Sequence, residues 1–266
     1  MKIKAIGLLL NLGLCLGSSA LADTRCFLIQ ERNTIIKQEG DCKVRYAPCS
    51  TFKIPIALMG YAEGLLLDEK HPEMPFKEGY ADWLDVWKQP HTPNTWMKNS
   101  CVWYSQVLTQ KLGIHKFQTY VTRFNYGNQD VSGDKGKDNG LTNAWLSSSL
   151  EISPEEQAVF LQNLIDNHVD VSLKAHANTK NILFLEDLPN GWKLYGKTGS
   201  GSLLSKDRMK KLDLQHGWFV GWIQKEGRTI VFVNHITDDK KQDTYASLRA
   251  KAEAKEKLAN LIQNLQ

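Results

Sequence analysis

Three segments near the C-terminus decide the fold: WKLYGKT at residues 192–198, GWFVGWIQ at 217–224 and TIVFVNHIT at 229–237. Each combines β-branched and aromatic residues, which favour strands. The polar tetrapeptide KEGR at 225–228 has the glycine of a hairpin turn. We therefore expect a sheet at this end of the chain, with the last two segments as neighbouring antiparallel strands.

Two shorter strands are expected at the opposite end, at residues 26–30 and 33–38. Helical spacing of apolar residues predominates in the middle, at 51–63, 100–112, 114–124, from 153 onward, and at 172–182. An amphipathic helix at 244–263 closes the chain, with an expected apolar side of Tyr245, Leu248, Ala252, Ala259, Ile262 and Leu265. This order predicts an α+β fold: the terminal strands pair in one central antiparallel sheet, the last helix packs on it, and the middle helices form a helical lobe.

Composition limits the class of protein. The 266 residues are 42% hydrophobic and 23% charged, which excludes a disordered chain and a multi-span membrane protein. The formal net charge is +4, spread over 33 basic and 29 acidic residues. This balance does not indicate the strongly basic surface of a nucleic-acid-binding protein. We therefore expect no nucleic-acid partner.

The N-terminus has the pattern of a secretory signal peptide. Lys2 and Lys4 precede an apolar run at residues 5–16, and Ala20 and Ala22 form a small-x-small cleavage pattern. Cleavage after Ala22 would remove residues 1–22 and leave 23–266 as one domain. No later apolar run reaches membrane length. We expect export to a bacterial periplasm, with no membrane attachment after cleavage.

Four cysteines remain after that cleavage: Cys26, Cys42, Cys49 and Cys101. An oxidising compartment permits disulfides, and four cysteines allow three pairings. Cys26 and Cys42 could face each other across the first two strands, which leaves Cys49 and Cys101; buried free thiols are the alternative. The absence of a Cys-x-x-Cys pair and of clustered histidines predicts no metal site.

Ser50 and Lys53 form a Ser-x-x-Lys pattern at an expected helix start. A residue three positions later lies on the same helix face, one turn on. If burial keeps that lysine neutral, it can accept the proton of the serine hydroxyl. The alternative is a helix-capping serine with an exposed lysine.

Lys197-Thr198-Gly199 closes an expected strand, followed by Ser200. A lysine there projects into the cleft that the strand borders, and the glycine lets a substrate lie against the strand. The alternative is an ordinary turn. Two further patterns, Ser100-Cys101-Val102 at a helix start and Tyr126-Gly127-Asn128 in a loop, have a capping serine and a plain turn as their alternatives.

Together these patterns resemble the class D, oxacillinase-type, serine β-lactamases. The shared elements, in order, are STFK at 50–53, Ser-x-Val at 100–102, YGN at 126–128, Trp145-Leu146 and KTG at 197–199. The middle element differs from the Ser-Asp-Asn of class A enzymes. The resemblance covers essentially the whole chain after residue 22. It implies a β-lactamase/penicillin-binding transpeptidase-like fold.

The resemblance also implies roles for individual residues. Ser50 would be the nucleophile and Lys53 the general base, N-carboxylated by CO₂ or bicarbonate, with Trp145 donating to the carbamate. Ser100 would pass a proton to the leaving nitrogen, assisted by Lys197. The expected substrate-binding residues are Ser50, Ser100, Val102, Tyr126, Asn128, Leu146, Thr198, Gly199, Ser200 and Arg249.

The implied activity is hydrolysis of the β-lactam amide of penicillins and related antibiotics, with resistance as its consequence. The expected partner is a small-molecule β-lactam, no cofactor is needed beyond CO₂, and the protein is a monomer or homodimer. A β-lactam-sensing or penicillin-binding domain that acylates without efficient turnover is the alternative. Because Ser50 and Ser100 would meet in the site, their neighbours Cys49 and Cys101 could also form a disulfide.

Overall fold

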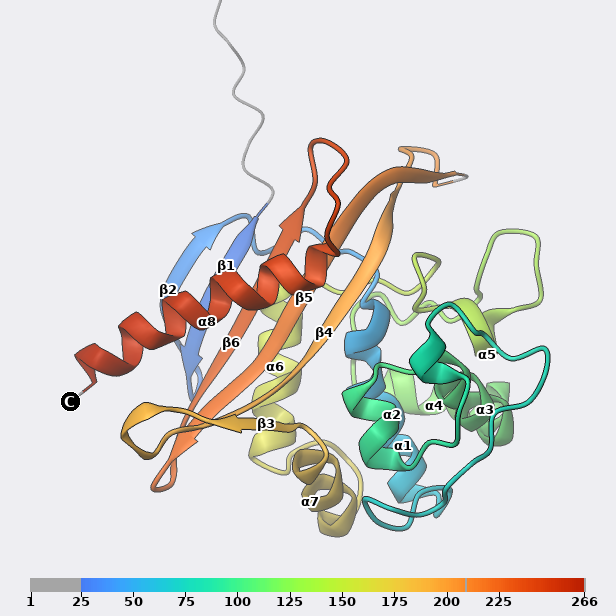
Figure 1. Ribbon diagram of the computed structural model, residues 1–266, viewed down its shortest axis with the longest axis horizontal. Coiled ribbons are helices and arrows are strands. Elements are labelled where there is room, and N and C mark those ends of the chain that lie inside the picture. The colour runs from blue at the N-terminus through green and yellow to red at the C-terminus, as the bar shows by residue number, and fades with distance from the viewer. Residues whose placement is uncertain (1–24, 209, 266) are drawn as a thin grey trace, which may run out of the picture.

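An antiparallel sheet organises the computed structural model, which describes residues 25–208 and 210–265. Its six strands lie in the order β2-β1-β6-β5-β4-β3 (Figure 1). They are β1 (Cys26–Glu31), β2 (Thr34–Gly40), β3 (Phe184–Asp187), β4 (Lys193–Leu204), β5 (Lys211–Lys225) and β6 (Arg228–Thr237). The N-terminal β1 pairs with the C-terminal β6, Ile29 opposite Phe232, which confirms the expected pairing of the chain ends.

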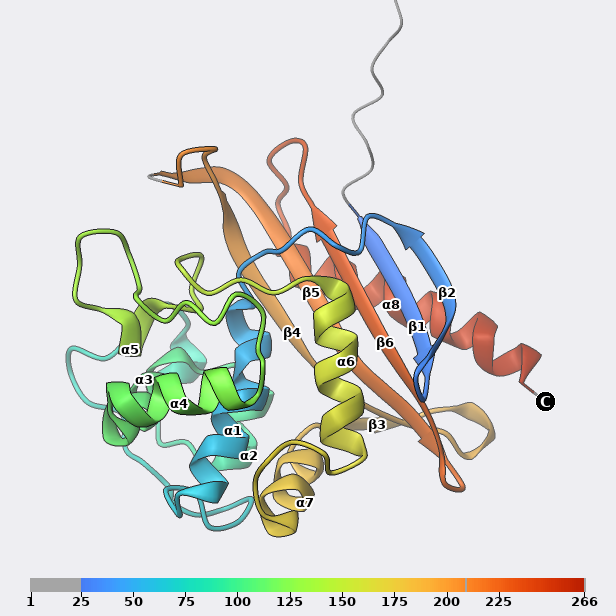
Figure 2. The ribbon, with the colours of Figure 1, turned by 180° about the vertical axis from the view of Figure 1, so that it is seen from behind.

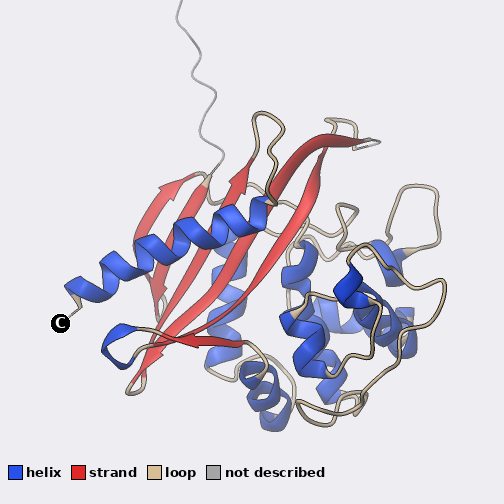
Figure 3. Ribbon diagram, in the orientation of Figure 1, coloured by secondary structure: helices blue, strands red, loops and turns tan. Residues whose placement is uncertain are grey.

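Helices fill the chain between β2 and β3. They are α1 (Lys53–Ala62), α2 (Pro93–Lys98), α3 (Val102–Leu112), α4 (Ile114–Arg123), α5 (Gly140–Asn143), α6 (Pro154–Ile165) and α7 (Leu173–Asn181), with 3-10 turns η1 (Cys49–Phe52) and η2 (Asp85–Trp87). A third 3-10 turn, η3 (Pro189–Gly191), precedes β4, and α8 (Ala246–Asn264) follows β6. Figure 3 shows α1 to α5 gathered beside the sheet at its β4 side.

The sheet carries a hydrophobic core on each face. Seen from behind in Figure 2, α6 crosses one face, while α8 lies on the other. The α8 face differs from the expected one, since Tyr245 and Leu248 are 54% and 56% exposed. The buried apolar positions are Ala246, Ala250, Ala254, Leu258 and Ile262. Small alanine side chains let the helix approach the sheet closely, and that spacing decides which face packs inward.

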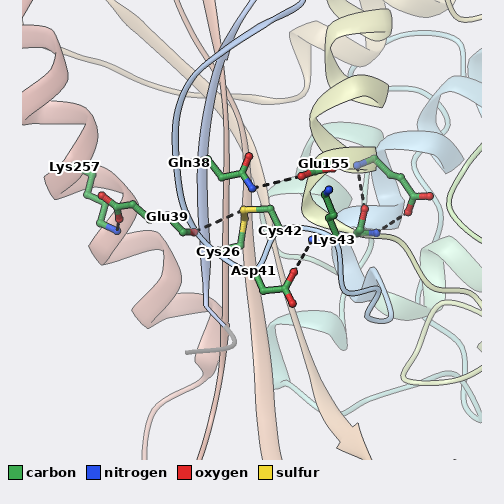
Figure 4. Close-up of a disulfide and its surroundings, with 10 residues drawn as sticks. Cys26, Gln38, Glu39, Asp41, Cys42, Lys43, Glu155 and Lys257 are labelled. Atoms are coloured by element: carbon green, nitrogen blue, oxygen red, sulfur yellow. Dashed lines mark hydrogen bonds and ion pairs between the residues drawn. A yellow bond between two sulfur atoms is a disulfide. The ribbon is translucent and has the colours of Figure 1, made fainter. Parts of the chain in front are cut away.

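One disulfide joins Cys26 to Cys42 with a Cα–Cα distance of 5.1 Å, as the sequence suggested (Figure 4). It ties the first strand to the chain that leaves β2. On one side of it Lys257 of α8 bonds Glu39 over 2.6 Å, and on the other the Glu155 N–H at the start of α6 donates to Cys42 O over 3.1 Å. The first hairpin is thereby fixed to helices on both faces.

The second candidate disulfide is wrong: Cys49 and Cys101 are buried free thiols. The Cys49 Sγ points toward β5, where it lies 3.8 Å from His216 Nε2. The expected meeting of Ser50 and Ser100 does not imply a bond between their neighbours, because adjacent residues direct their side chains to different sides of the backbone.

One further difference concerns an edge strand, and one prediction for the N-terminus stays untested. The edge strand β3 was not predicted, and its four residues include the exposed Phe184 and Leu185, which show no alternation of buried and exposed positions. The expected signal peptide at residues 1–22 lies outside the described residues. Over the part of the chain that the structure describes, no helix is both long and apolar enough to cross a membrane.

Candidate active site

Ser50 lies in the 3-10 turn η1, and Lys53 is the first residue of α1. The α-helix begins later than the sequence suggested, because Pro55 has no N–H to bond one turn back. Ser50 and Lys53 nevertheless meet: Lys53 Nζ donates to Ser50 Oγ over 3.3 Å. The expected proximity of hydroxyl and amine is therefore present.

Lys53 is fully buried. Burial lowers the pKa of its amine to about 8, while the nearby Cys101 and Cys49 act in the opposite direction. A capping serine would be paired with an exposed lysine, so this burial removes the alternative interpretation. A neutral amine is accessible close to neutral pH.

A second lysine, on the sheet, reaches a second serine, at the start of the helical part. Lys197 Nζ, from β4, donates to Ser100 Oγ over 2.9 Å and to Thr198 O over 3.0 Å. Burial holds the pKa of Lys197 well below its ordinary value, and the charge of Lys53 adds to this. Ser100 precedes α3 with a φ of +56°, a left-handed conformation that costs a non-glycine residue energy.

Gly199 brings β4 against the nucleophile turn. A Cβ at this position would lie 2.8 Å from Pro48 O and 3.2 Å from Ser50 N. The sequence interpretation assigned the missing side chain to substrate access, whereas the contact is with η1. Gly199 therefore positions the turn that carries Ser50.

Trp145 and Val102 belong to the same hydrophobic core as Phe52, and Leu146 packs against that core. Trp145 is fully buried, stacks on Phe52 with ring centroids 5.6 Å apart, and accepts through its carbonyl from Cys49 N over 2.9 Å. Its indole Nε1 has no hydrogen-bond partner. Val102 is 2% exposed and Leu146 half-buried. A buried hydrogen-bond donor, Trp145 Nε1, is thus available on a ring that stacks on Phe52, the residue before Lys53.

Tyr126 and Asn128 lie in supporting positions. Tyr126 is fully buried and packs edge-on against Phe52, with ring centroids 5.2 Å apart, so it has no surface to offer a ligand. Asn128 bonds the chain around it, donating to Ser149 O over 2.8 Å and accepting from Glu151 N over 3.0 Å. Both residues were expected to bind substrate. In the structure Tyr126 packs against Phe52 of η1, and Asn128 holds the neighbouring chain together.

The first turn of α8 borders the far end of β4. Ser247 N donates to Ser200 Oγ over 2.9 Å. Arg249, two residues on, bonds Asp238 through Nη2 over 2.7 Å. The structure thus brings the first turn of α8 to the strand that carries Lys197, while the Arg249 guanidinium itself bonds a carboxylate of its own chain.

Sequence reasoning missed a buried polar group behind Ser50. Cys49 Sγ lies beside His216, and His216 Nδ1 lies 3.2 Å from His235 Nε2. Tyr46 stacks on the His216 ring and lies tilted against the His235 ring. Burial lowers the pKa of His216 to about 4 and that of His235 well below its ordinary value. Histidines on two different strands gave no local pattern in the sequence.

Within residues 25–208 and 210–265, no three His, Cys, Asp or Glu side chains are placed to hold a metal ion. The chemistry available from these described side chains is that of hydroxyls and amines: two serines, each within bonding distance of a buried lysine. This arrangement suits nucleophilic attack on a carbonyl followed by proton transfer to a leaving nitrogen.

Comparison with known proteins identifies relatives over most of the chain. Residues 22–260 match the family model described as the penicillin binding protein transpeptidase domain. The chain is 42% identical over 235 residues to β-lactamase OXA-1 of Escherichia coli, covering 86% of this chain and 82% of that protein. It is 38% identical over 251 residues to β-lactamase OXA-9 of Klebsiella pneumoniae, covering 93% and 91%.

The fold agrees with these relatives. The crystal structure of the class D β-lactamase OXA-427 superimposes with a TM-score of 0.87 at 46% identity, covering 91% of this chain and 100% of that one. Ordered motifs, sheet topology and the two lysine–serine pairs point to the same conclusion: the chain belongs to the class D β-lactamases.

Proposed function

We propose that this protein hydrolyses the amide bond of β-lactam antibiotics through an acyl-enzyme on Ser50, with residues 23–266 acting as one catalytic domain. The observation that carries the proposal is the pair of short lysine–serine contacts, Lys53 to Ser50 and Lys197 to Ser100, at 3.3 and 2.9 Å. Over both steps one water molecule is added across the C–N bond of the ring.

In acylation, Ser50 Oγ attacks the carbonyl carbon and its proton passes to the base at Lys53. The C–N bond then breaks, and the nitrogen takes a proton from Ser100, which in turn recovers the proton that the base took from Ser50; Lys197 supports Ser100 through its 2.9 Å bond. The backbone N–H groups of Ser50 and Ser200 would bind the developing oxyanion. Val102 and Leu146 would keep water away from the lysine.

Lys53 fits N-carboxylation by CO₂, since only a neutral amine reacts with CO₂ and burial lowers the pKa of this one to about 8. The buried, unpartnered Nε1 of Trp145 is a donor of the kind that a carbamate oxygen needs. Bound there, the carbamate would supply a base for deacylation, a task for which residues 146–149 contain no carboxylate.

The substrate carboxylate would bind Thr198, Ser200 and Arg249 at the end of β4. We further propose that residues 1–22 direct export to the periplasm and that hydrolysis there confers resistance. A monomer or homodimer suffices for this chemistry, because each proposed group comes from one chain.

Turnover of a chromogenic cephalosporin tests the proposal directly. Purified protein should release many equivalents of product per mole. A burst that stops at one equivalent would show a sensor or penicillin-binding activity, and the complete absence of a covalent adduct would show that Ser50 is not a nucleophile.

A further inference from the structure

A carboxylate of this chain already engages the guanidinium of Arg249. Arg249 Nη2 donates to Asp238 Oδ1 over 2.7 Å, and 2% of the Asp238 side chain is exposed against 29% of the Arg249 side chain. Hydrogen bonds between opposite charges are among the stronger ones in proteins. An anion that approaches Arg249 therefore meets a cation whose charge is compensated.

The pair is tied to β5 and, through the start of α8, to β4, the strand that carries Lys197. Asp238 follows β6 directly, and its N–H donates to Gln215 O over 2.8 Å. The side chain of Gln215 accepts from Ala246 N over 3.2 Å, and the next N–H, of Ser247, donates to Ser200 Oγ over 2.9 Å. These bonds hold the end of β6 against β5 and the start of α8 against β5 and β4, so the backbone that carries Arg249 is fixed relative to Ser200.

Bonding capacity remains on both members of the pair. Arg249 Nε and Asp238 Oδ2 are buried and have no hydrogen-bond partner. A guanidinium carries five N–H donors and can bind a carboxylate with two parallel bonds. A single bond to Asp238 leaves donors for a second carboxylate, but that carboxylate is repelled by the first.

We propose that Asp238 is a positioning residue that holds Arg249 beside Ser200 and, by compensating its charge, weakens recognition of the substrate carboxylate. The inference rests on the proposed function, in which Arg249 binds that group. Recognition then depends on hydroxyl donors from Thr198 and Ser200 more than on net charge. A β-lactam whose carboxylate is esterified should therefore remain a substrate.

The test compares a chromogenic cephalosporin that has a free carboxylate with its neutral methyl ester. In Asp238→Asn the amide oxygen still accepts from Arg249, but the negative charge is gone. We expect KM for the acid to fall about tenfold, because the variant removes the repulsion between the Asp238 carboxylate and the substrate carboxylate. Two charges a few ångströms apart near a protein surface interact strongly enough for an effect of this size. KM for the ester should stay the same, and kcat should change less than about twofold for both compounds, since the reacting atoms are untouched.

Asp187→Asn is the matched control. Asp187, on the edge strand β3, forms an exposed ion pair with Lys193 at 2.7 Å, at the opposite end of β4 from Ser200, so this variant removes the same charge outside the Arg249–Asp238 pair. It should leave both KM values unchanged. If Asp238→Asn leaves KM for the acid unchanged or higher, or shifts acid and ester alike, the proposal is overturned.

A second comparison does not depend on the folding of Asp238→Asn. In Arg249→Ala the uncompensated Asp238 should repel the acid, so KM for the acid should rise more than in Asp238→Asn/Arg249→Ala, where both charges are absent. Equal values in the two variants contradict the inference. A wild-type protein that turns over neither compound contradicts the proposed function instead.

Discussion

Lys197 Nζ lies 2.9 Å from Ser100 Oγ, although the two residues are 97 positions apart in the chain. The contact joins β4 of the sheet to the turn before α3, so it spans the boundary between sheet and helices. A hydroxyl that accepts from a lysine has its own proton available for another acceptor. In this position the acceptor would be the leaving nitrogen.

Ser100→Gly should lower the rate of acylation by about two to four orders of magnitude, the usual contribution of a positioned proton donor. Glycine removes the hydroxyl and also suits the φ of +56° at this position, so folding should be retained. Pre-steady-state kinetics would measure the acylation rate, with thermal melting as the check on folding. Unchanged acylation would exclude Ser100 from proton transfer.

Ser50→Ala should abolish turnover while leaving the fold intact, because the side chain loses one oxygen in a turn held by backbone contacts. Mass spectrometry after incubation with penicillin should show no added mass. A covalent adduct in this variant would place the nucleophile elsewhere.

Trp145→Phe should increase the bicarbonate concentration needed for full activity. The ring can still stack on Phe52, but the unpartnered Nε1 donor is removed. A hydrogen bond to a charged group contributes roughly 1.5–3 kcal/mol, which corresponds to about ten- to hundredfold in apparent affinity. Steady-state rates over a bicarbonate titration give the measurement. An identical titration curve for wild type and variant would argue against a carbamate on Lys53.

Acid should destabilise the protein through His216 and His235. Burial lowers the pKa of His216 from 6.5 to about 4, so the folded state binds fewer protons than the unfolded chain in this window. The stability is complete above about pH 6.5 and is lost progressively as pH falls toward 4, on the order of 3 kcal/mol for this residue.

His216→Gln should flatten that acid limb in urea unfolding measured from pH 7 to pH 4. His115→Gln, at an exposed position of α4, is the control and should keep the wild-type slope. Parallel curves for wild type and His216→Gln would show that other groups determine the acid sensitivity.

Removal of the disulfide by Cys26→Ser/Cys42→Ser should lower the free energy of unfolding by about 3 kcal/mol, since the bridge closes a loop between residues 16 positions apart. Urea unfolding without reductant would measure the loss. Thiol titration of a denatured, unreduced chain of residues 23–266 should find the two free thiols, Cys49 and Cys101. Four thiols would contradict the bridge.

The sheet could be predicted from sequence because most of its strands carry strong β-branched and aromatic runs, and because these runs lie at the two termini with helical patterns between them. The buried face of α8 could not be predicted in this way. Leu248 is more hydrophobic than Ala250, yet Leu248 is exposed and Ala250 faces the sheet. Close packing of the helix on the sheet favours small side chains, and the pattern of hydrophobic residues in the sequence does not reveal this preference.

The candidate active site was likewise predictable from sequence only in part. Ser50, Lys53, Ser100 and Lys197 are recognisable from short motifs with defined spacing, and the structure brings them together in pairs. Asp238 and His216 have no motif, because their partners Arg249 and His235 are chosen by tertiary packing alone. Gly199 was found by its motif, but its steric purpose depends on the approach of η1 and could only be seen in three dimensions.

The pairing of β1 with β6 has a consequence for the order of folding. A ribosome releases Cys26 long before His235, the residue opposite it in the finished sheet. Until then β1 has only the local β2 as a partner, so its other edge stays unpaired throughout synthesis. Contacts so distant in sequence form slowly, and we expect the last strand to complete the sheet in a late, rate-limiting step.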